Sequence, residues 1–468
     1  MFIFIRLVAI FCKYTQKNVS LQIKNDKIMP QNQKHGNIIA IIVMIFLFGM
    51  IAFVTNLASP MGDILKHQFG IANWMGTLGV FAIFIAYAVM GYPAGSLLQK
   101  HGYKKTALLA IAIGFTGVGV QTVSGVFGSF GIYLLGAFIA GLSVCLLNTV
   151  INPMMVKLGG GGNKSNRLIQ IGGTFSSISG TSVILLTGIL IPSITQAQIS
   201  DVFPLMFAAL AIFAFAFIVI ASTNIPENNQ EIPAFAGMTQ EKPMEVTKSP
   251  LSYRHFVLGA IGVFVYVGIE VGIPNVLNKW LQNPQLNVLG AVNAEVMAAS
   301  VAATYWFLML VGRFIGVAVG GRVSPKAMLI FTSCLGLILT LSAIFAPSSV
   351  MVSMPVFKND AYALFGLANV PISAALLVCL GLCTSVMWGG IFTLAVDGLG
   401  KHTEKASGIF MVMVCGGGIL PLLQNGIIDL AGGVGHLVSY WVVVAGLLYL
   451  LYYALIGSKN VNRAKRAH

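Results

Sequence analysis

The stretch GSLLQKHGYKK, residues 95–105, places three lysines between two long apolar runs. A related basic stretch, GGRVSPK at 320–326, separates two later runs in the same way. Each flanking run approaches or exceeds the roughly 20 residues that a helix needs to cross a bilayer. The two basic connections therefore predict membrane-spanning helices that turn back at charged loops. Their recurrence predicts a chain of two related halves.

Composition excludes a soluble protein. The 468 residues are 57% hydrophobic and 9% charged, whereas soluble domains carry roughly 25% charged residues. We expect an all-α membrane protein of twelve transmembrane helices in two six-helix bundles. The predicted spans are 38–58, 74–98, 105–126, 130–156, 168–192, 203–224, 255–280, 297–320, 327–346, 371–397, 406–431 and 435–457.

The positions of the basic residues set the predicted orientation. With both termini in the cytoplasm, 23 of the 27 Lys and Arg residues fall on the inside, as the positive-inside rule requires. Lys66, Lys279 and Lys358 fall outside, and Arg313 lies within a span. The formal charge of +14 therefore indicates membrane topology, and we expect no nucleic-acid partner.

Polar segments divide the predicted fold. Residues 225–254, rich in Pro, Glu and Lys, predict a flexible cytoplasmic linker between the halves. Met29 precedes a polar lead into the first span, so translation starts either there or at Met1. The remaining predicted segments are an N-terminal cytoplasmic segment 1–37, a first bundle 38–224, a second bundle 255–457 and a basic tail 458–468.

Glu270 is the one acidic residue placed deep within a predicted span, in FVYVGIEVGIPN at 264–275. A charged group at a helix centre costs about 2.5–3.5 kcal/mol on insertion scales. Tyr266, Glu270 and Pro274 share one helical face. We interpret Glu270 as facing a central cavity, where it binds substrate or carries a proton. The alternative is a protonated Glu that bonds a neighbouring helix for packing.

Arg313 is the second embedded charge, nine residues before Arg322, or about 13 Å from the predicted cytoplasmic end. It is predicted to pair with a carboxylate or helix-end carbonyls at an inner gate. The competing interpretation is that its side chain extends to the membrane surface.

Amides supply the other candidate binding groups, because they offer both donors and acceptors to sugar hydroxyls. Asn148 and Asn152 lie four residues apart on one helical face. Bonding between helices is the competing account of this pair. Aromatic rings near them suit stacking on a sugar, although membrane Trp residues also pack or anchor. The wider predicted binding set is Asn56, Tyr266, Asn275, Trp388 and Gln424.

The sequence lacks a nucleotide-binding loop and the common hydrolase and zinc motifs. GGGGNKSNR at 159–167 does not have the spacing of a phosphate-binding loop. The six cysteines lack metal-ligand spacing and are interpreted as small buried hydrophobic residues. We therefore expect neither an enzyme nor a metal site, and no bound cofactor.

The quoted motifs resemble the fucose–galactose–glucose:proton symporter family of the major facilitator superfamily. The similarity spans 38–457 and is carried by six stretches: YPAGSLLQKHGYKK, LLNTVINPMMVKLG, FVYVGIEVGIPNVL, YWFLMLVGRFIG, IFTLAVDGLGKHTEKASG and GGGILPLLQNGIIDLAG. The resemblance implies a monomer in the bacterial inner membrane that imports a hexose or deoxyhexose by alternating access. A co-transported proton or sodium ion is implied, with Glu270 as the coupling residue.

The sequence departs from the fucose-transporting branch at two carboxylate positions. Ser59 stands where that branch has Asp in the first span, although Asp63 follows one turn later, and Asn148 stands where it has Glu. Gln99 stands where the superfamily usually has Asp, and Ser176 stands where the family usually has Asn. A facilitative sugar carrier and an exporter of another small polar metabolite or drug are the alternative functions.

Overall fold

The computed structural model describes residues 31–69, 78–190, 198–223, 225, 249–283, 294–347, 349–357, 365–432 and 435–459. Most of the predicted linker, residues 1–30 and residues 460–468 lie outside these ranges. Helices make up nearly all of the described chain, as predicted.

Six spans form the N-terminal half of the molecule. Long apolar sequences favour helices in lipid, because a helix satisfies its backbone polar groups internally. The elements of this half are α2 (Gln31–Phe69), α4 (Leu78–Phe127), α5 (Phe130–Gly159), α6 (Gly162–Leu190), η1 (Ile199–Val202) and α7 (Phe203–Ser222).

The C-terminal half repeats this pattern with more interruptions. The spans begin at α9 and end with a π-helical turn, η5. The elements are η2 (Pro250–Ser252), α9 (Arg254–Leu281), α10 (Ala294–Val319), α11 (Pro325–Phe345), β1 (Met351–Phe357), β2 (Phe365–Pro371), α12 (Ile372–Thr384), α13 (Met387–Ala395), η3 (Gly400–His402), α14 (Thr403–Met413), α15 (Gly416–Ala431), α16 (Gly435–Val438), α17 (Trp441–Tyr452) and η5 (Tyr453–Gly457).

The described helices give twelve spans. Ten are long and apolar enough to cross a membrane by length and composition. One of them, α4, crosses twice, because Gly102 interrupts its helical backbone at φ 78° within the basic stretch. The twelfth is α6, which is rich in Ser, Thr and Gly. The antiparallel pair β1–β2 was not predicted and adds a hairpin between α11 and α12.

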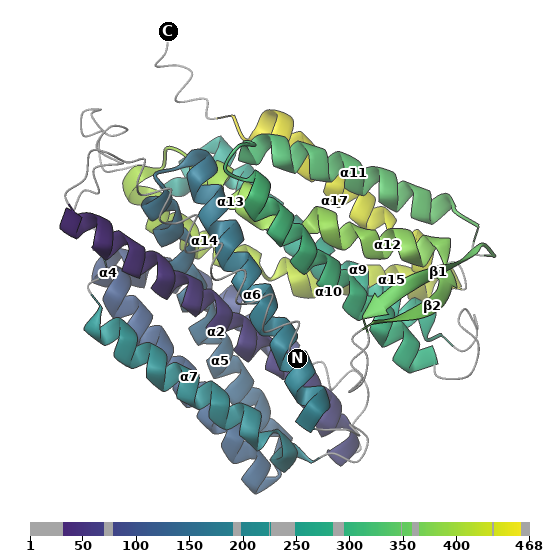
Figure 1. Cartoon of the computed structure of the whole chain (residues 1–468), viewed down its shortest axis with the longest axis horizontal. Coiled ribbons are helices and arrows are strands. Elements are labelled where there is room, and N and C mark those ends of the chain that lie inside the picture. The colour runs from purple at the N-terminus through teal and green to yellow at the C-terminus, as the bar shows by residue number, and fades with distance from the viewer. Residues whose placement is uncertain are drawn as a thin grey trace.

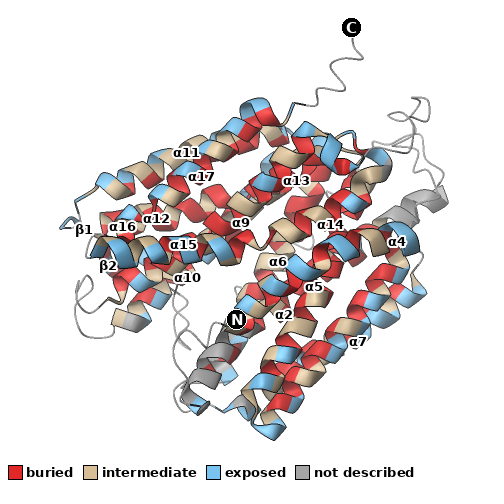
Figure 2. Ribbon diagram, turned by 180° about the vertical axis from the view of Figure 1, so that it is seen from behind, coloured by how far each residue is buried: buried red, intermediate tan, exposed pale blue. Residues whose placement is uncertain are grey.

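The two bundles meet at one end of the molecule and diverge toward the other (Figure 1). We call the first end the basic face, because the connections at 100–105, 157–167, 322–326 and 401–405 lie there. The end that carries the β1–β2 hairpin is called the opposite face. Buried residues concentrate where helices contact one another, and exposed ones line the outer surfaces (Figure 2).

Close helix contact across the halves depends on glycines of α4 and α14. A Cβ at Gly408 would lie 2.5 Å from the carbonyl oxygen of Gly91 and 2.6 Å from the nitrogen of Gly95. Real Cβ atoms do not approach backbone so closely, so the two helices meet backbone to backbone. Small residues allow such approach in membranes, where dispersion contacts hold helices together.

We expect Gly408→Ala to destabilise the closed basic face, because the added methyl group meets rigid backbone. Overpacking typically costs about 1–3 kcal/mol, which thermal unfolding of the purified protein would show as a lower melting temperature. Gly119→Ala is the matched control, since a Cβ there meets nothing within 4 Å. Equal melting temperatures for the two variants would contradict the contact.

Candidate functional site

Charged and polar side chains of both halves meet near mid-depth, where α5 and α6 face α9, α10 and α13. Glu270 lies on α9, 16 residues after Arg254, and its side chain is 15% exposed. Its Oε1 lies 3.6 Å from Nη2 of Arg313, whose side chain is 14% exposed. The deep carboxylate therefore pairs with the deep guanidinium within the C-terminal half.

Arg313 also joins the two halves. Its Nη1 donates to the backbone carbonyl of Gly173 at 2.7 Å and to Oγ of Ser177 at 2.5 Å, both on α6. A Cβ at Gly173 would lie 3.6 Å from Cδ and Nε of Arg313, so glycine leaves room for the stem of that side chain. The side chain is thus directed into the seam between the bundles and is not extended toward the membrane surface.

A second cross-half bond lies beside this cluster. Nε1 of Trp388, on α13, donates to Oδ1 of Asn152 on α5 at 3.1 Å. Asn152 is fully buried, and its Nδ2 donates to the carbonyl of Asn148 at 2.8 Å. The predicted amide pair therefore bonds within α5 and reaches across to the other half, as the packing interpretation expects.

Asn148 is half-buried and held by a tyrosine from α4. Its Nδ2 donates to the hydroxyl of Tyr87 at 2.6 Å and to the carbonyl of Val144 at 3.2 Å. Because these bonds occupy the amide hydrogens, the Oδ1 atom of Asn148 is left as an acceptor. Tyr87 is buried, and sequence reasoning did not identify it.

Aromatic rings line the same region. The ring centroids of Tyr266 and Trp388 lie 6.3 Å apart at an interplanar angle of 48°. Trp388 is also stacked against Phe392, at 6.4 Å and 19°. Tyr266 precedes Glu270 by one helical turn, as the sequence predicted, so the rings and the carboxylate approach the seam from one side.

The remaining predicted residues lie at different places. Asn56 of α2 packs its amide against Gly180 of α6, two turns beyond Gly173 on the same face. Gln424 is buried within the C-terminal half, where its Nε2 lies 3.5 Å from the carbonyl of Ser439 and its amide oxygen packs against Gly272. Asn275 lies toward the opposite face, and its Oδ1 is buried without a hydrogen-bond partner among the described residues.

Several bonding residues of α6 were missed. Ser177 holds Arg313, and the buried Gln170 donates from Nε2 to the carbonyl of Val386 at 2.9 Å. One face of α6 carries polar side chains at helical spacing, which is unusual for a span that faces lipid. They are Gln170, Thr174, Ser177 and Thr181. That polar stripe is the sequence signal that would have indicated a face in contact with the other half.

The seam is closed from mid-depth to the basic face. Tyr103 of α4 donates its hydroxyl to Oε1 of the buried Glu404 on α14 at 3.1 Å. Ser407 donates to the carbonyl of Thr149 at 3.1 Å. Nζ of Lys157 lies 5.2 Å from the ring centroid of Tyr103. These contacts form a floor beneath the polar cluster.

Two six-helix bundles around a mid-depth polar seam define a membrane transporter. The family model described as Major Facilitator Superfamily matches residues 39–422. The chain therefore belongs to the major facilitator superfamily, and its family comprises transporters rather than enzymes.

The relatives and solved structures are similar over almost the whole chain. A glucose/galactose transporter of Brucella abortus is 28% identical, over 90% of this chain and 94% of the relative. An L-fucose-proton symporter of Escherichia coli is 21% identical, over 89% and 93%. The crystal structure of the transporter FucP in the outward conformation matches with a TM-score of 0.73 at 19% identity, covering 91% of this chain and 100% of that one.

We predict that Arg313→Met lowers the melting temperature and that the double variant with Glu270→Gln recovers part of the loss. Removing one partner of a buried pair leaves an uncompensated charge, at a cost of about 3–5 kcal/mol when burial is complete. Both side chains keep some exposure to solvent, so we expect the variant to lose about 3 kcal/mol of stability or less. Thermal unfolding would measure the recovery, and a double variant no more stable than Arg313→Met would contradict the pairing.

Proposed function

We propose that the protein is a secondary active transporter that imports a hexose or deoxyhexose by alternating access with a co-transported cation. The observation that carries this proposal is the seam itself, where groups from both halves meet at mid-depth above a closed basic-side floor. Relatives named for glucose/galactose and fucose transport support the substrate class.

The proposed sugar site lies above the floor, between α4 and α5 on one side and α9 and α13 on the other. Oδ1 of Asn148 accepts a hydrogen bond from a sugar hydroxyl, because Tyr87 and the carbonyl of Val144 hold its amide hydrogens away. The rings of Tyr266 and Trp388 offer apolar faces to the C–H side of the sugar. Asn152 contributes when its bond to Trp388 exchanges for a bond to substrate.

The proposed binding set also includes Asn56, Asn275 and Gln424. The structure supports direct contact with substrate to a different degree for each of them. Asn56 shares the α6 face that Arg313 contacts, and so lies on the side of the seam. Gln424 packs between helices of one half, which supports a structural contribution. Oδ1 of Asn275 is buried without a hydrogen-bond partner in the described part of the chain, and a change in helix packing would allow it to bond.

Glu270 is the proposed coupling residue, and Arg313 the proposed gate. The α6 oxygens lie closer to the guanidinium than the carboxylate does. Glu270 and α6 therefore share one guanidinium, Glu270 at Nη2 and α6 at Nη1. Adding a proton to Glu270 removes its charge from this shared contact, and changes how firmly Arg313 holds the halves together.

The proposed setting is a cell membrane, the bacterial inner membrane, with the basic face and both termini in the cytoplasm. Basic connections at that face support this orientation. The bundles 38–224 and 255–457, joined by residues 225–254, would then move relative to each other. We propose a monomer surrounded by lipid, with a proton or a sodium ion as the coupled cation.

Proton coupling at Glu270 predicts different defects in two variants. Glu270→Gln keeps a hydrogen-bonding group that cannot titrate, so it should retain sugar exchange and lose accumulation against a gradient. Glu270→Ala should lose both activities. Uptake of labelled glucose, galactose, fucose and mannose into vesicles, with imposed pH or sodium gradients, measures this. Full accumulation by both variants would exclude the assignment, and gradient-independent uptake by the unaltered protein would indicate a facilitative carrier.

Tyr87→Phe tests how Asn148 is presented to the sugar. Losing one hydrogen bond of about 1 kcal/mol frees the amide to rotate, and should raise the KM for sugar about fivefold with little change in maximal rate. Tyr440→Phe is the matched control, because its buried hydroxyl donates to the carbonyl of Ile273 within the C-terminal half. Equal KM values for the two variants would contradict this role of Tyr87.

A further inference from the structure

The β1–β2 hairpin is unusual in having apolar residues on both faces. Its strands, MVSMPVF and FGLANVP, contain no charged residue. The antiparallel register pairs Val352 with Val370 and Met354 with Ala368 on the face that we call inner. Val356, Val370 and Ala368 are buried there, so the inner face packs on the C-terminal half.

The other face of the hairpin is exposed although it is largely apolar. It carries Met351 at 46%, Phe365 at 47% and Leu367 at 72% exposure, together with Pro355, and one exposed polar pair, Ser353 opposite Asn369. In water, each such side chain would forgo about 25 cal/mol for every Å² of apolar surface that it could bury. An exposed apolar patch on two strands without charged residues indicates a partner that is itself apolar.

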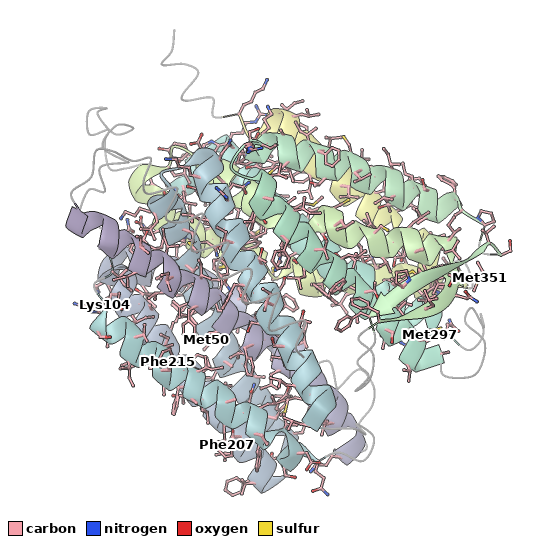
Figure 3. All side chains as sticks on the ribbon, in the orientation of Figure 1. Met50, Lys104, Phe207, Phe215, Met297 and Met351 are labelled. Carbon is pink, nitrogen blue, oxygen red and sulfur yellow. The ribbon has the colours of Figure 1, made fainter. Side chains whose placement is uncertain are left out.

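The hairpin lies along the flank of the membrane-spanning part. The backbone nitrogen of Phe357 donates to Oγ1 of Thr304 on α10 at 2.8 Å. Thr304 lies ten residues after Ala294, the first residue of α10, or about 15 Å along the helix. Phe357 and Phe365 form the end row of the outer face, and their rings lie 5.7 and 5.0 Å from that of Phe307, so this end of the face packs partly on α10. The hairpin crosses in front of α10 in Figure 1, and Figure 3 marks Met351 on it.

The exposed face continues a surface that already faces lipid. Phe331, Ile338 and Phe345 recur every seven residues along α11 and are 67%, 61% and 72% exposed. Phe345 is edge-on to Trp441, with ring centroids 6.2 Å apart. Aromatic residues at the end of a span are typical of a membrane–water interface. Met351 follows that end of α11 by six residues.

We propose that the outer face of the β1–β2 hairpin binds the phospholipid leaflet at the opposite face, at the boundary between headgroups and acyl chains. The apolar side chains would contact the upper acyl chains. Apart from the N–H of Phe357, which donates to Thr304, the outward backbone groups of a two-stranded sheet need water or headgroups as partners, which excludes the hydrocarbon centre. This proposal depends on the membrane fold alone and does not require sugar transport.

The experiment places an environment-sensitive fluorophore on Leu367→Cys in a variant whose six native cysteines are replaced, reconstituted in liposomes. Phospholipid brominated near the glycerol end of its chains should reduce the emission by about half, and bromination near the chain ends should reduce it less. Phe331→Cys is the lipid-facing control and Lys405→Cys the water-facing one. Aqueous iodide should quench only the Lys405→Cys label.

Quenching of the Leu367→Cys label by iodide to the extent seen at Lys405→Cys would overturn the proposal. Shielding from both quenchers would also overturn it, because the hairpin would then cover protein. The unaltered protein gives a second test that needs no substitution. In nanodiscs, a phospholipid with a diazirine near the glycerol end should label peptide 351–371, and an unlabelled peptide beside labelled α11 would contradict lipid contact.

Discussion

A guanidinium placed inside a membrane needs acceptors within reach, and Arg313 finds them on both halves of the molecule. Two oxygens of α6 and the carboxylate of Glu270 surround it. Arg313 reaches all of these acceptors only when the bundles are in contact. The same contact therefore stabilises the closed seam, and the proposed coupling at Glu270 acts through it. A fold that relied on apolar packing alone would lack such a contact.

The contacts around Arg313 differ in how readily they can exchange. At the basic face, α4 and α14 touch through glycine backbones, a dry contact that depends on shape. At mid-depth, Trp388–Asn152 and Arg313–Ser177 are polar contacts between side chains, which can exchange for bonds to another polar partner. Breaks between α12 and α13 and between α14 and α15 lie in the spans that face the other half. Movement of the bundles thus needs exchange of polar partners at the seam and separation of close-packed glycines below it.

Much of the fold follows from hydropathy and charge in the sequence, because spanning length and basic loops are local properties. The twelve spans and the Tyr266–Glu270 face could be predicted in this way. The partners could not, because which helix Arg313 meets depends on how two distant halves pack. Nothing in the sequence distinguishes Tyr87 from other tyrosines in the spans, and only its bond to Asn148 identifies it. Gln424 and Asn152 have the same kind of amide, yet one packs within a half and the other across the seam. The hairpin was missed because the length of a short apolar segment between spans does not distinguish a strand from a helix or a loop.

The central claim is that the contacts of Arg313 at mid-depth hold the two halves together and so keep the basic face closed. Double electron–electron resonance between spin labels at Lys100 and Lys459, one on each half at that face, measures this directly. In the unaltered background without sugar, we predict a single short-distance population, while Arg313→Met adds a longer one. In Arg313→Met, the distance between a second pair of labels, at Val126 and Leu430 on the opposite face, should become shorter. Identical distance distributions with and without Arg313 would contradict the account.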